Sequence, residues 1–241
     1  MVPRTCPACL AKLTLSGRGE TPAAGEQYLQ RRRNMWISPN FQRSDFKRDL
    51  NIDDMIAIFE DRTLGWQLRI AQETCAKIPH AGFAVLHIVM SYFEMITQFE
   101  RGEISEGRSP EFFKHGLKSV LPELANNQYL DDISRILYRQ ARCGLYHSGI
   151  TKANITISNS AAEALAWVKD FGRLIVNPES LVKAMIVHFE GFVRRLKDSK
   201  EAELRANFKK RFELEKPKID MSVLPPDSYL AVEAFGSSSF D

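Results

Sequence analysis

The sequence has few of the features that mark membrane, secreted or metal-dependent proteins. Its longest apolar run, residues 81–93, is too short to cross a bilayer and contains His87. The N-terminal region lacks a basic stretch followed by an apolar stretch and a small-residue cleavage site. We therefore expect a cytoplasmic protein with no membrane partner.

Cysteine is scarce, with four residues in a chain of 241. Cys6 and Cys9 have the spacing of half a zinc ribbon or of a redox pair, but a structural zinc needs four ligands and a second CxxC is missing. The plainer interpretation is an unpaired motif in a reducing cytosol. We predict no metal and no other cofactor.

Several motifs of well-known enzyme classes are also missing. The sequence contains no P-loop, no dinucleotide-binding glycine motif and no GxSxG nucleophile elbow. These absences argue against ATP-driven, nicotinamide-dependent and serine-hydrolase mechanisms.

Positive charge is concentrated near the N-terminus. Residues 1–49 contain nine Lys and Arg against four Asp and Glu, which leaves 24 positive and 26 negative side chains in the rest of the chain. A domain that binds long nucleic acids is expected to carry a basic face, and the bulk charge gives no sign of one. A local cluster such as Arg135, Arg139 and Arg142 stays possible, as does nonspecific binding of nucleic acid by the arginine run at residues 31–33.

The pattern along the chain predicts a mainly α-helical protein. Apolar residues recur at helical spacing over residues 51–79, 82–99, 109–122 and 130–141, which suggests an antiparallel four-helix bundle. Residues 154–176 read as a small antiparallel sheet of two or three strands, and residues 178–214 as long C-terminal helices. We predict a single domain over residues 44–216. We expect residues 1–43 to be a disordered basic tail or the result of a start codon assigned too early, and residues 217–241 to be a second tail.

Some individual positions carry sharper expectations. The buried face of the first helix should include Trp66 and Ile70, and that of the second Phe83 and Phe93. Ser109 should cap the third helix. Glu94 is a carboxylate on a mostly apolar helix, so it needs a positive partner, and Arg142 and Arg108 are the two candidates.

The segment YRQARCGLYHSG, residues 138–149, contains the one compact arrangement that suggests chemistry. Arg142 stays charged and can hold a phosphate with two hydrogen bonds, whereas His147 can move a proton near neutral pH. Together they suit cleavage of a phosphodiester without a metal. Arg108 and His115 have similar spacing, but only the first pair follows a predicted helix beside two glycines.

This Arg142 to His147 spacing, after a four-helix pattern, resembles the R-x(4-6)-H signature of the HEPN superfamily. The resemblance covers about residues 51–150. It implies a metal-independent ribonuclease of a bacterial stress or defence system, acting on RNA as a homodimer, with a cognate antitoxin or another partner protein. Arg142 would orient the phosphate and His147 would transfer a proton. Cys143 departs from the family, in which a polar residue usually follows the arginine.

Helix geometry leaves three interpretations of the motif open. Residues five apart on a straight helix are separated by roughly 140°, so Arg142 and His147 would not share a face. Either Gly144 breaks the helix, or the site is composite, or the pair is simply a surface arginine and a core histidine. On a continuous helix Arg142 would align with Tyr138 and Tyr146. We expect Glu94, Cys143 and Tyr146 to be the supporting residues of the candidate site.

Two functions follow from these alternatives. The first is an RNA endonuclease in which the ribose 2'-hydroxyl attacks the adjacent phosphate and leaves a 2',3'-cyclic phosphate. The second is a non-catalytic helical module that dimerises or binds a partner protein.

Overall fold

The computed structural model describes residues 36–42, 45–46 and 49–220, the side chains of residues 216–220 excepted. The CxxC pair, the arginine run and most of both predicted tails lie outside these residues. Residues 36–42, which we expected in the N-terminal tail, instead pack on the first helix. The Ser38 hydroxyl and the Asn40 amide both donate to the Asp61 carboxylate. The folded domain therefore begins earlier than the sequence indicated.

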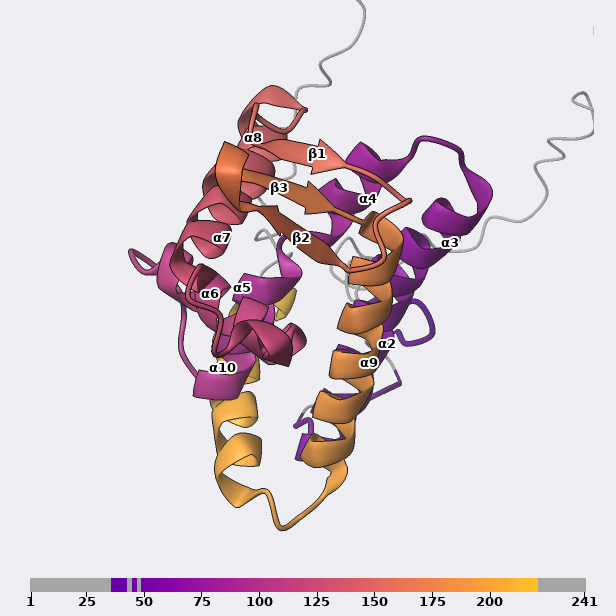
Figure 1. Cartoon of the computed structure of the whole chain (residues 1–241). Helices are drawn as coiled ribbons and strands as arrows, with labels where there is room; N and C mark the ends of the chain where they lie inside the picture. The colour runs from indigo at the N-terminus through magenta and orange to yellow at the C-terminus, as the bar shows by residue number, and fades with distance from the viewer. Residues whose placement is uncertain (1–35, 43–44, 47–48, 221–241) are drawn as a thin grey trace, which may run out of the picture.

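The protein is mainly helical, with one small sheet (Figure 1). The first half contains α2 (Ile52–Thr63), η3 (Leu64–Leu68), α3 (Arg69–Lys77), α4 (Gly82–Val89), α5 (Tyr92–Arg101), α6 (Ser109–Val120) and η4 (Pro122–Leu124). The second half contains α7 (Leu130–Ile136), η5 (Leu137–Arg142), α8 (Cys143–Ser148), β1 (Ile155–Ile157), β2 (Leu165–Val168), η6 (Lys169–Phe171), β3 (Arg173–Val176), α9 (Pro178–Lys197) and α10 (Ala202–Asp220).

Local sequence signals fix the start of two long helices. Asn51 caps α2, and its side chain and that of Asp54 each accept the other's backbone N–H, which forms a capping box. Asn177 caps α9 by accepting the N–H groups of Glu179 and Ser180, with Pro178 at the first helical position. Both caps satisfy amide groups that the first helical turn leaves without partners.

Two π-helical segments, η3 and η5, interrupt otherwise continuous helices. A π-turn contains more residues than an α-turn, so the side chains that follow it rotate relative to the regular helical pattern. Trp66 and Ile70 consequently lie 49% and 46% exposed, although the spacing predicted that both are buried. Trp66 lies within η3 and Ile70 just after it, and the regular helical period fails at both positions.

The predicted central helix is divided into α4 and α5 at Met90 and Ser91. Gln67 marks the division, since its amide donates to the Ile88 carbonyl and the Ser91 hydroxyl. Phe93 is buried as expected, but Phe83, near the start of α4, is 43% exposed. One apolar stripe therefore does not continue through both helices.

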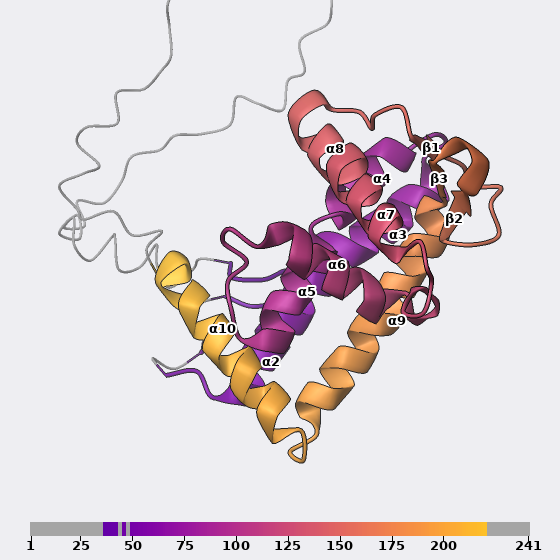
Figure 2. The ribbon, with the colours of Figure 1, turned by 60° about the vertical axis from the view of Figure 1, so that its left-hand side comes forward.

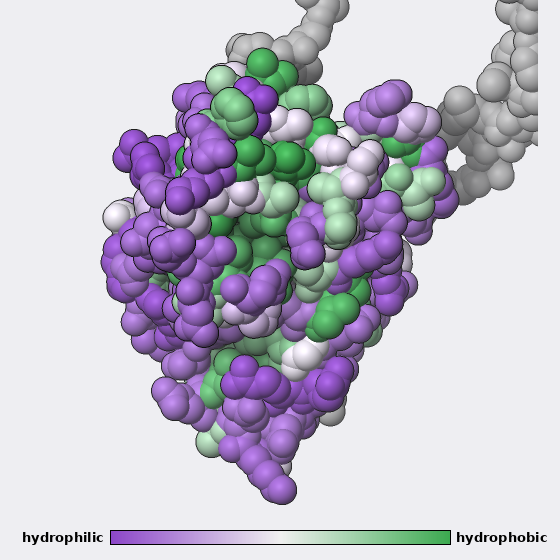
Figure 3. Space-filling view, viewed as in Figure 1, coloured by the Kyte–Doolittle hydropathy of each residue, from purple (hydrophilic) through white to green (hydrophobic). Residues whose placement is uncertain are grey.

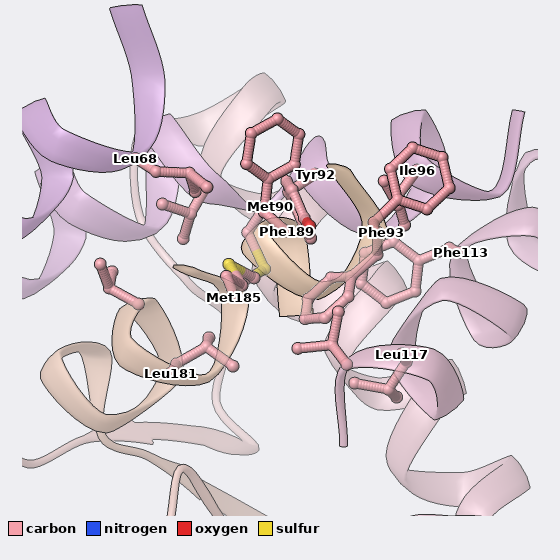
Figure 4. Close-up of a cluster of buried hydrophobic side chains, with 14 of the residues drawn as sticks. Leu68, Met90, Tyr92, Phe93, Ile96, Phe113, Leu117, Leu181, Met185 and Phe189 are labelled. Carbon is pink, nitrogen blue, oxygen red and sulfur yellow. The ribbon is translucent and has the colours of Figure 1, made fainter. Parts of the chain in front are cut away.

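The hydrophobic core lies where α5, α6 and α9 meet (Figure 4). Tyr92, Phe93 and Ile96 of α5 face Phe113 of α6 and Phe189 of α9. The apolar residues at helical spacing in α9 and α10 form the inward faces of these helices, because all eight are buried: Leu181, Met185, Phe189, Phe192, Leu196, Leu204, Phe208 and Phe212.

A glycine sets the distance between α5 and α6. A Cβ atom at Gly116 would lie 1.9 Å from the carbonyl oxygen of Phe93, so no other residue fits there without moving a backbone. Close packing of these two helices brings the start of α6 beside the middle of α5. This contact positions the polar residues described below.

The sheet has three strands in the order β1-β3-β2. β2 pairs antiparallel with β3, but β1 pairs parallel with β3, so the sheet is mixed and the expectation of an antiparallel sheet is wrong for β1. β1 and β2 are the two edge strands, and β3, the last in sequence, lies between them, antiparallel to β2 and in the same direction as β1. Figure 2 shows the sheet at one end of the molecule, beside α8, α4 and the start of α9.

The face of the molecule in Figure 3 is largely hydrophilic. On the face in Figure 3, hydrophobic residues gather in a hollow below the sheet and between α6 and α9. One helical stretch, Gly82–Arg101, is long and apolar enough to cross a membrane, but half of it is buried inside the protein. A core helix of a soluble protein has the same properties.

Candidate functional site

The segment that carries the Arg142 to His147 motif is one continuous helical rod made of α7, η5 and α8. The rod ends at Gly149, which has the left-handed backbone (φ 72°) that glycine favours. Gly144 therefore does not break the helix. It lets the following chain pass close by, since a Cβ atom there would lie 2.9 Å from the Ile150 carbonyl oxygen. Of the three interpretations, a broken helix is excluded.

Arg142 lies at the end of the π-turn and forms an ion pair with Glu94 of α5. The Arg142 Nη2 to Glu94 Oε2 distance is 3.2 Å, and the two side chains are only 26% and 12% exposed. The other oxygen of Glu94 accepts hydrogen bonds from the hydroxyls of Ser109 (2.7 Å) and Ser105. Every oxygen of this carboxylate thus has a partner, as a partly buried charge requires.

The structure distinguishes the two arginines that were candidates for Glu94. Arg108 instead binds Glu103 and Glu111 at the surface. Ser109 is the first residue of α6 and not its cap, because its hydroxyl is directed to Glu94 and Arg108 occupies the cap position.

Two tyrosines flank the Arg142 guanidinium. Its Cζ atom lies 5.3 Å from the ring centroids of both Tyr138 and Tyr146, as their alignment on a continuous helix predicts. Burial tends to lower the pKa of Arg142, but Tyr138, Glu94 and Cys143 outweigh it and the net pKa is raised. Burial raises the pKa of Tyr138, against the opposing effects of Arg142 and of a hydrogen bond with Ser109. Arg142 is therefore a fixed, permanent cation.

One donor of the Arg142 guanidinium has no protein partner. The Nε atom is buried and forms no hydrogen bond, a property it shares with Trp167 Nε1 among the described side chains. An unpaired buried donor of a charged group is costly, and native structures contain few of them.

The other motif residues are more exposed. His147 lies on the surface in the last turn of α8, which excludes the interpretation of a core histidine. Tyr146 is 65% exposed, whereas Cys143 is half-buried, and its thiol has a side-chain hydrogen bond with Arg142. Arg142 faces α5 and α6, and His147 faces solvent, so the two do not converge on one point within a single chain.

A second polar cluster, which the sequence did not reveal, lies further along α5. Glu100 Oε2 is 3.2 Å from His115 Nε2 and 3.5 Å from the Ser119 hydroxyl. Burial raises the pKa of Glu100, against the opposing charge of Arg195 and the Ser119 hydrogen bond. These residues are scattered over three helices, so no local spacing marks them as a group.

The same cluster extends to a buried tyrosine and histidine pair. Tyr92 Oη lies 2.9 Å from His188 Nδ1. Burial, and secondarily the charge of Arg195, lowers the pKa of His188 to about 4, so the imidazole is neutral at pH 7 while its Nδ1 atom shares a hydrogen bond with the Tyr92 hydroxyl. Burial also raises the pKa of Tyr92 well above its usual value.

A cavity of about 500 Å³ lies elsewhere, between the start of α4 and the end of β1. It is lined mainly by apolar groups: Pro79, His80, Gly82, Phe83, Ile157 and Asn159. Within the described ranges, no three or more His, Cys, Asp and Glu side chains are grouped so that they could hold a metal ion.

Comparison of the chain with protein-family models, with curated proteins and with solved structures finds no match.

Proposed function

We propose that this chain is a metal-independent endoribonuclease of the HEPN type, a toxin-like component of a bacterial stress or defence system. One observation supports the proposal above others. Glu94 and two tyrosines hold the guanidinium of Arg142 in place, and the exposed imidazole of His147 follows five residues later on the same helix. In this view α2–α3, α4–α5, α6 and α7–α8 correspond to the four-helix bundle of that superfamily.

The chemistry follows from the two side chains. Cleavage of RNA without a metal needs a group that moves the proton of the ribose 2'-hydroxyl and a cation that stabilises the additional charge on the phosphate. His147 moves the proton, and Arg142 neutralises the charge. The 2'-oxygen bonds to phosphorus as the 5'-oxygen of the next nucleotide leaves with a proton, which yields a 2',3'-cyclic phosphate.

The directions of Arg142 and His147 favour a composite site in a homodimer. Since α8 continues past Gly144, the two side chains of one copy point to different sides of the helix. A second copy would supply the missing partner. Tyr146 and Ile150, which are 65% and 59% exposed, provide apolar surface beside His147 for such a contact.

The test is incubation of purified protein with labelled single-stranded RNA in EDTA, followed by analysis of the fragment ends. We expect wild type to leave 2',3'-cyclic phosphate, and His147→Ala and Arg142→Ala to cleave at least about 100-fold more slowly. His87→Ala, which removes another exposed histidine, is the control and should keep full activity. DNA, which lacks the 2'-hydroxyl, should stay intact.

Mixing the two inactive variants tests the composite site. If one copy supplies Arg142 and the other His147, random dimers of the two variants recover about a quarter of the wild-type activity. Recovery of none would place both groups within one copy.

The alternative function is a non-catalytic helical module for dimerisation or protein binding. It is favoured by the fact that Glu94 already neutralises Arg142. Equal inactivity of folded wild type and both variants on varied RNAs would support it and refute the ribonuclease.

A further inference from the structure

The turn between β2 and β3 presents an aromatic ring between two cations. It runs through η6 to Gly172, whose φ of 53° lets the chain reverse, and Val168 pairs with Arg173 across it. Phe171 at its tip is 77% exposed, the highest value among the large hydrophobic side chains that the structure describes. This ring is not part of the hydrophobic core, and it is free to contact a ligand.

Hydrogen bonds fix this turn to the helix that carries the motif. The Asn154 side-chain amide donates to the Gly172 carbonyl (3.0 Å), and the Asn154 backbone N–H donates to Gln140 Oε1 (2.9 Å). The Lys152 N–H donates to the Gln140 carbonyl (3.0 Å). Gln140 lies in η5, two residues before Arg142. The turn, the segment before β1 and the motif helix therefore meet at one corner of the molecule (Figure 1).

Four cations at this corner have no carboxylate partner. Arg139, Lys152, Lys169 and Arg173 are all exposed, and across the described residues none forms an ion pair. Lys169 Nζ instead lies 5.8 Å from the centroid of the Tyr129 ring. Asp170, within the turn, is the nearest opposing charge in sequence. Residues 50–241 as a whole contain 24 positive and 26 negative side chains, so this group of unpaired cations is a local feature.

We propose that Arg139, Lys152, Lys169, Phe171 and Arg173, which we call the basic turn surface, bind single-stranded RNA. Phe171 stacks on a base, and the cations contact the phosphates on either side. Alternation of cation, aromatic ring and cation at residues 169, 171 and 173 suits a nucleotide strand, in which charged phosphates alternate with flat bases, better than an acidic peptide that offers carboxylates alone. Hydrogen bonds of Gln140 connect this surface to the helix that carries Arg142, and only the delivery of RNA to Arg142 rests on the proposed ribonuclease function.

Binding is measured by fluorescence anisotropy with a labelled single-stranded RNA, using the full chain with His147→Ala so that cleavage does not interfere. Adding Phe171→Ala should weaken binding by about ten-fold or more, because stacking of one base is lost. Adding Lys169→Gln and Arg173→Gln together should weaken binding and lower the slope of log Kd against log salt by about 1.4, which is 0.7 for each cation.

The matched control is Lys200→Gln with Lys210→Gln in the same background. Both lysines are exposed and have no ion-pair partner among the described residues, but they lie at the α9–α10 end of the molecule. This control should leave the affinity and the salt slope unchanged. Equal affinities of the control and the basic turn variants would overturn the inference, and so would displacement of RNA by polyglutamate at equal charge concentration.

Failure of this inference is distinguishable from failure of the ribonuclease proposal. If wild type cleaves no RNA but binds it through Phe171, Lys169 and Arg173, the surface stands and the catalytic proposal falls. If wild type cleaves RNA and the turn variants keep its KM and Kd, the enzyme stands and the surface falls.

Discussion

Glu94 and Glu100 lie six residues apart on α5, and each is largely buried, yet their surroundings differ. Glu94 faces the motif helix, where an arginine and two serines bind both of its oxygens. Glu100 faces α6 and α9, where a histidine and a distant serine contact one oxygen, and burial raises its pKa.

The comparison separates a buried carboxylate whose charge is fully compensated by its partners from one whose charge is not. Near Glu94 the partners come from η5, the start of α6 and the loop before α6, and they leave the carboxylate fully hydrogen-bonded. The Glu94–Arg142 pair thus holds the motif helix in one orientation. Near Glu100 the charged form is only partly compensated. The four predictions below test this contrast, in order of decreasing effect.

Gly116→Ala should disrupt the surroundings of both Glu94 and Glu100. The added methyl group would overlap the Phe93 carbonyl, so α5 and α6 must separate, and we expect a loss of at least about 3 kcal/mol in the free energy of unfolding. Urea denaturation measures it. Gly191→Ala in α9 is the control, since its new Cβ atom meets nothing within 4 Å, and it should be neutral or stabilising. Similar losses for both variants would show that helix separation is not the cause.

Glu94→Ala should destabilise the protein by about 3 kcal/mol, because it leaves the partly buried Arg142 without its counter-charge. Equilibrium urea unfolding at pH 7 gives the value. Glu111→Ala removes a carboxylate from exposed ion pairs and should cost much less, because water screens those pairs. Equal costs for Glu94 and Glu111 would mean that the burial of the Arg142 pair has no energetic consequence.

Acid should lower the free energy of unfolding through protonation of His188, which packs against the same helix, α5, as Glu100. The pKa of His188 is lowered to about 4 in the folded protein, so the unfolded chain binds more protons between that value and the ordinary pKa near 6.5. Stability is thus lost as the pH falls through this window, by about 2 kcal/mol after allowance for partial exposure. Thermal unfolding of wild type and His188→Gln from pH 7 to 4 measures it. The variant should show a flatter profile, and identical profiles would exclude His188 as the cause.

For Glu100 the pH dependence of the free energy of unfolding should have the opposite sign to that for His188, and Glu100→Gln tests this. Because the folded pKa of Glu100 is raised, its contribution to stability is present below the unfolded pKa near 4.5 and is lost as the pH rises through the folded value. Replacing the carboxylate by an amide removes this loss, so at pH 8 the variant should be more stable by on the order of 1 kcal/mol. The gain should disappear near pH 4, and a destabilised variant at pH 8 would contradict this account.

Much of the architecture was predictable from spacing alone. The eight inward positions of α9 and α10 and the Asn177 cap follow directly from helical periodicity and capping chemistry. Partnership of Glu94 with an arginine followed from the cost of burying a carboxylate, and Arg142 was one of two candidates.

Other features depend on long-range packing that no local pattern records. The π-turns moved Trp66 and Ile70 outward, and the insertion of β3 between β1 and β2 made one strand pair parallel. The hydroxyls of Ser105 and Ser109 and the cluster around Glu100 depend on the approach of α5 and α6 at Gly116. Exposure of His147 reversed the expected roles of a surface arginine and a core histidine.

The π-turn η5 has one more consequence. It behaves as a single extra residue wound into the rod, and it sets the rotational phase of everything after it. Deleting one residue from Leu137–Arg142 would restore α-helical winding with little change in the direction of α8, because five residues in an α-helix turn the chain about as far as six in the wider π-turn. Regular α-helical winding of all six residues would instead turn the chain about 100° further and carry Arg142 away from Glu94. The π-turn, and not the Arg and His motif itself, thus sets the direction in which Arg142 points.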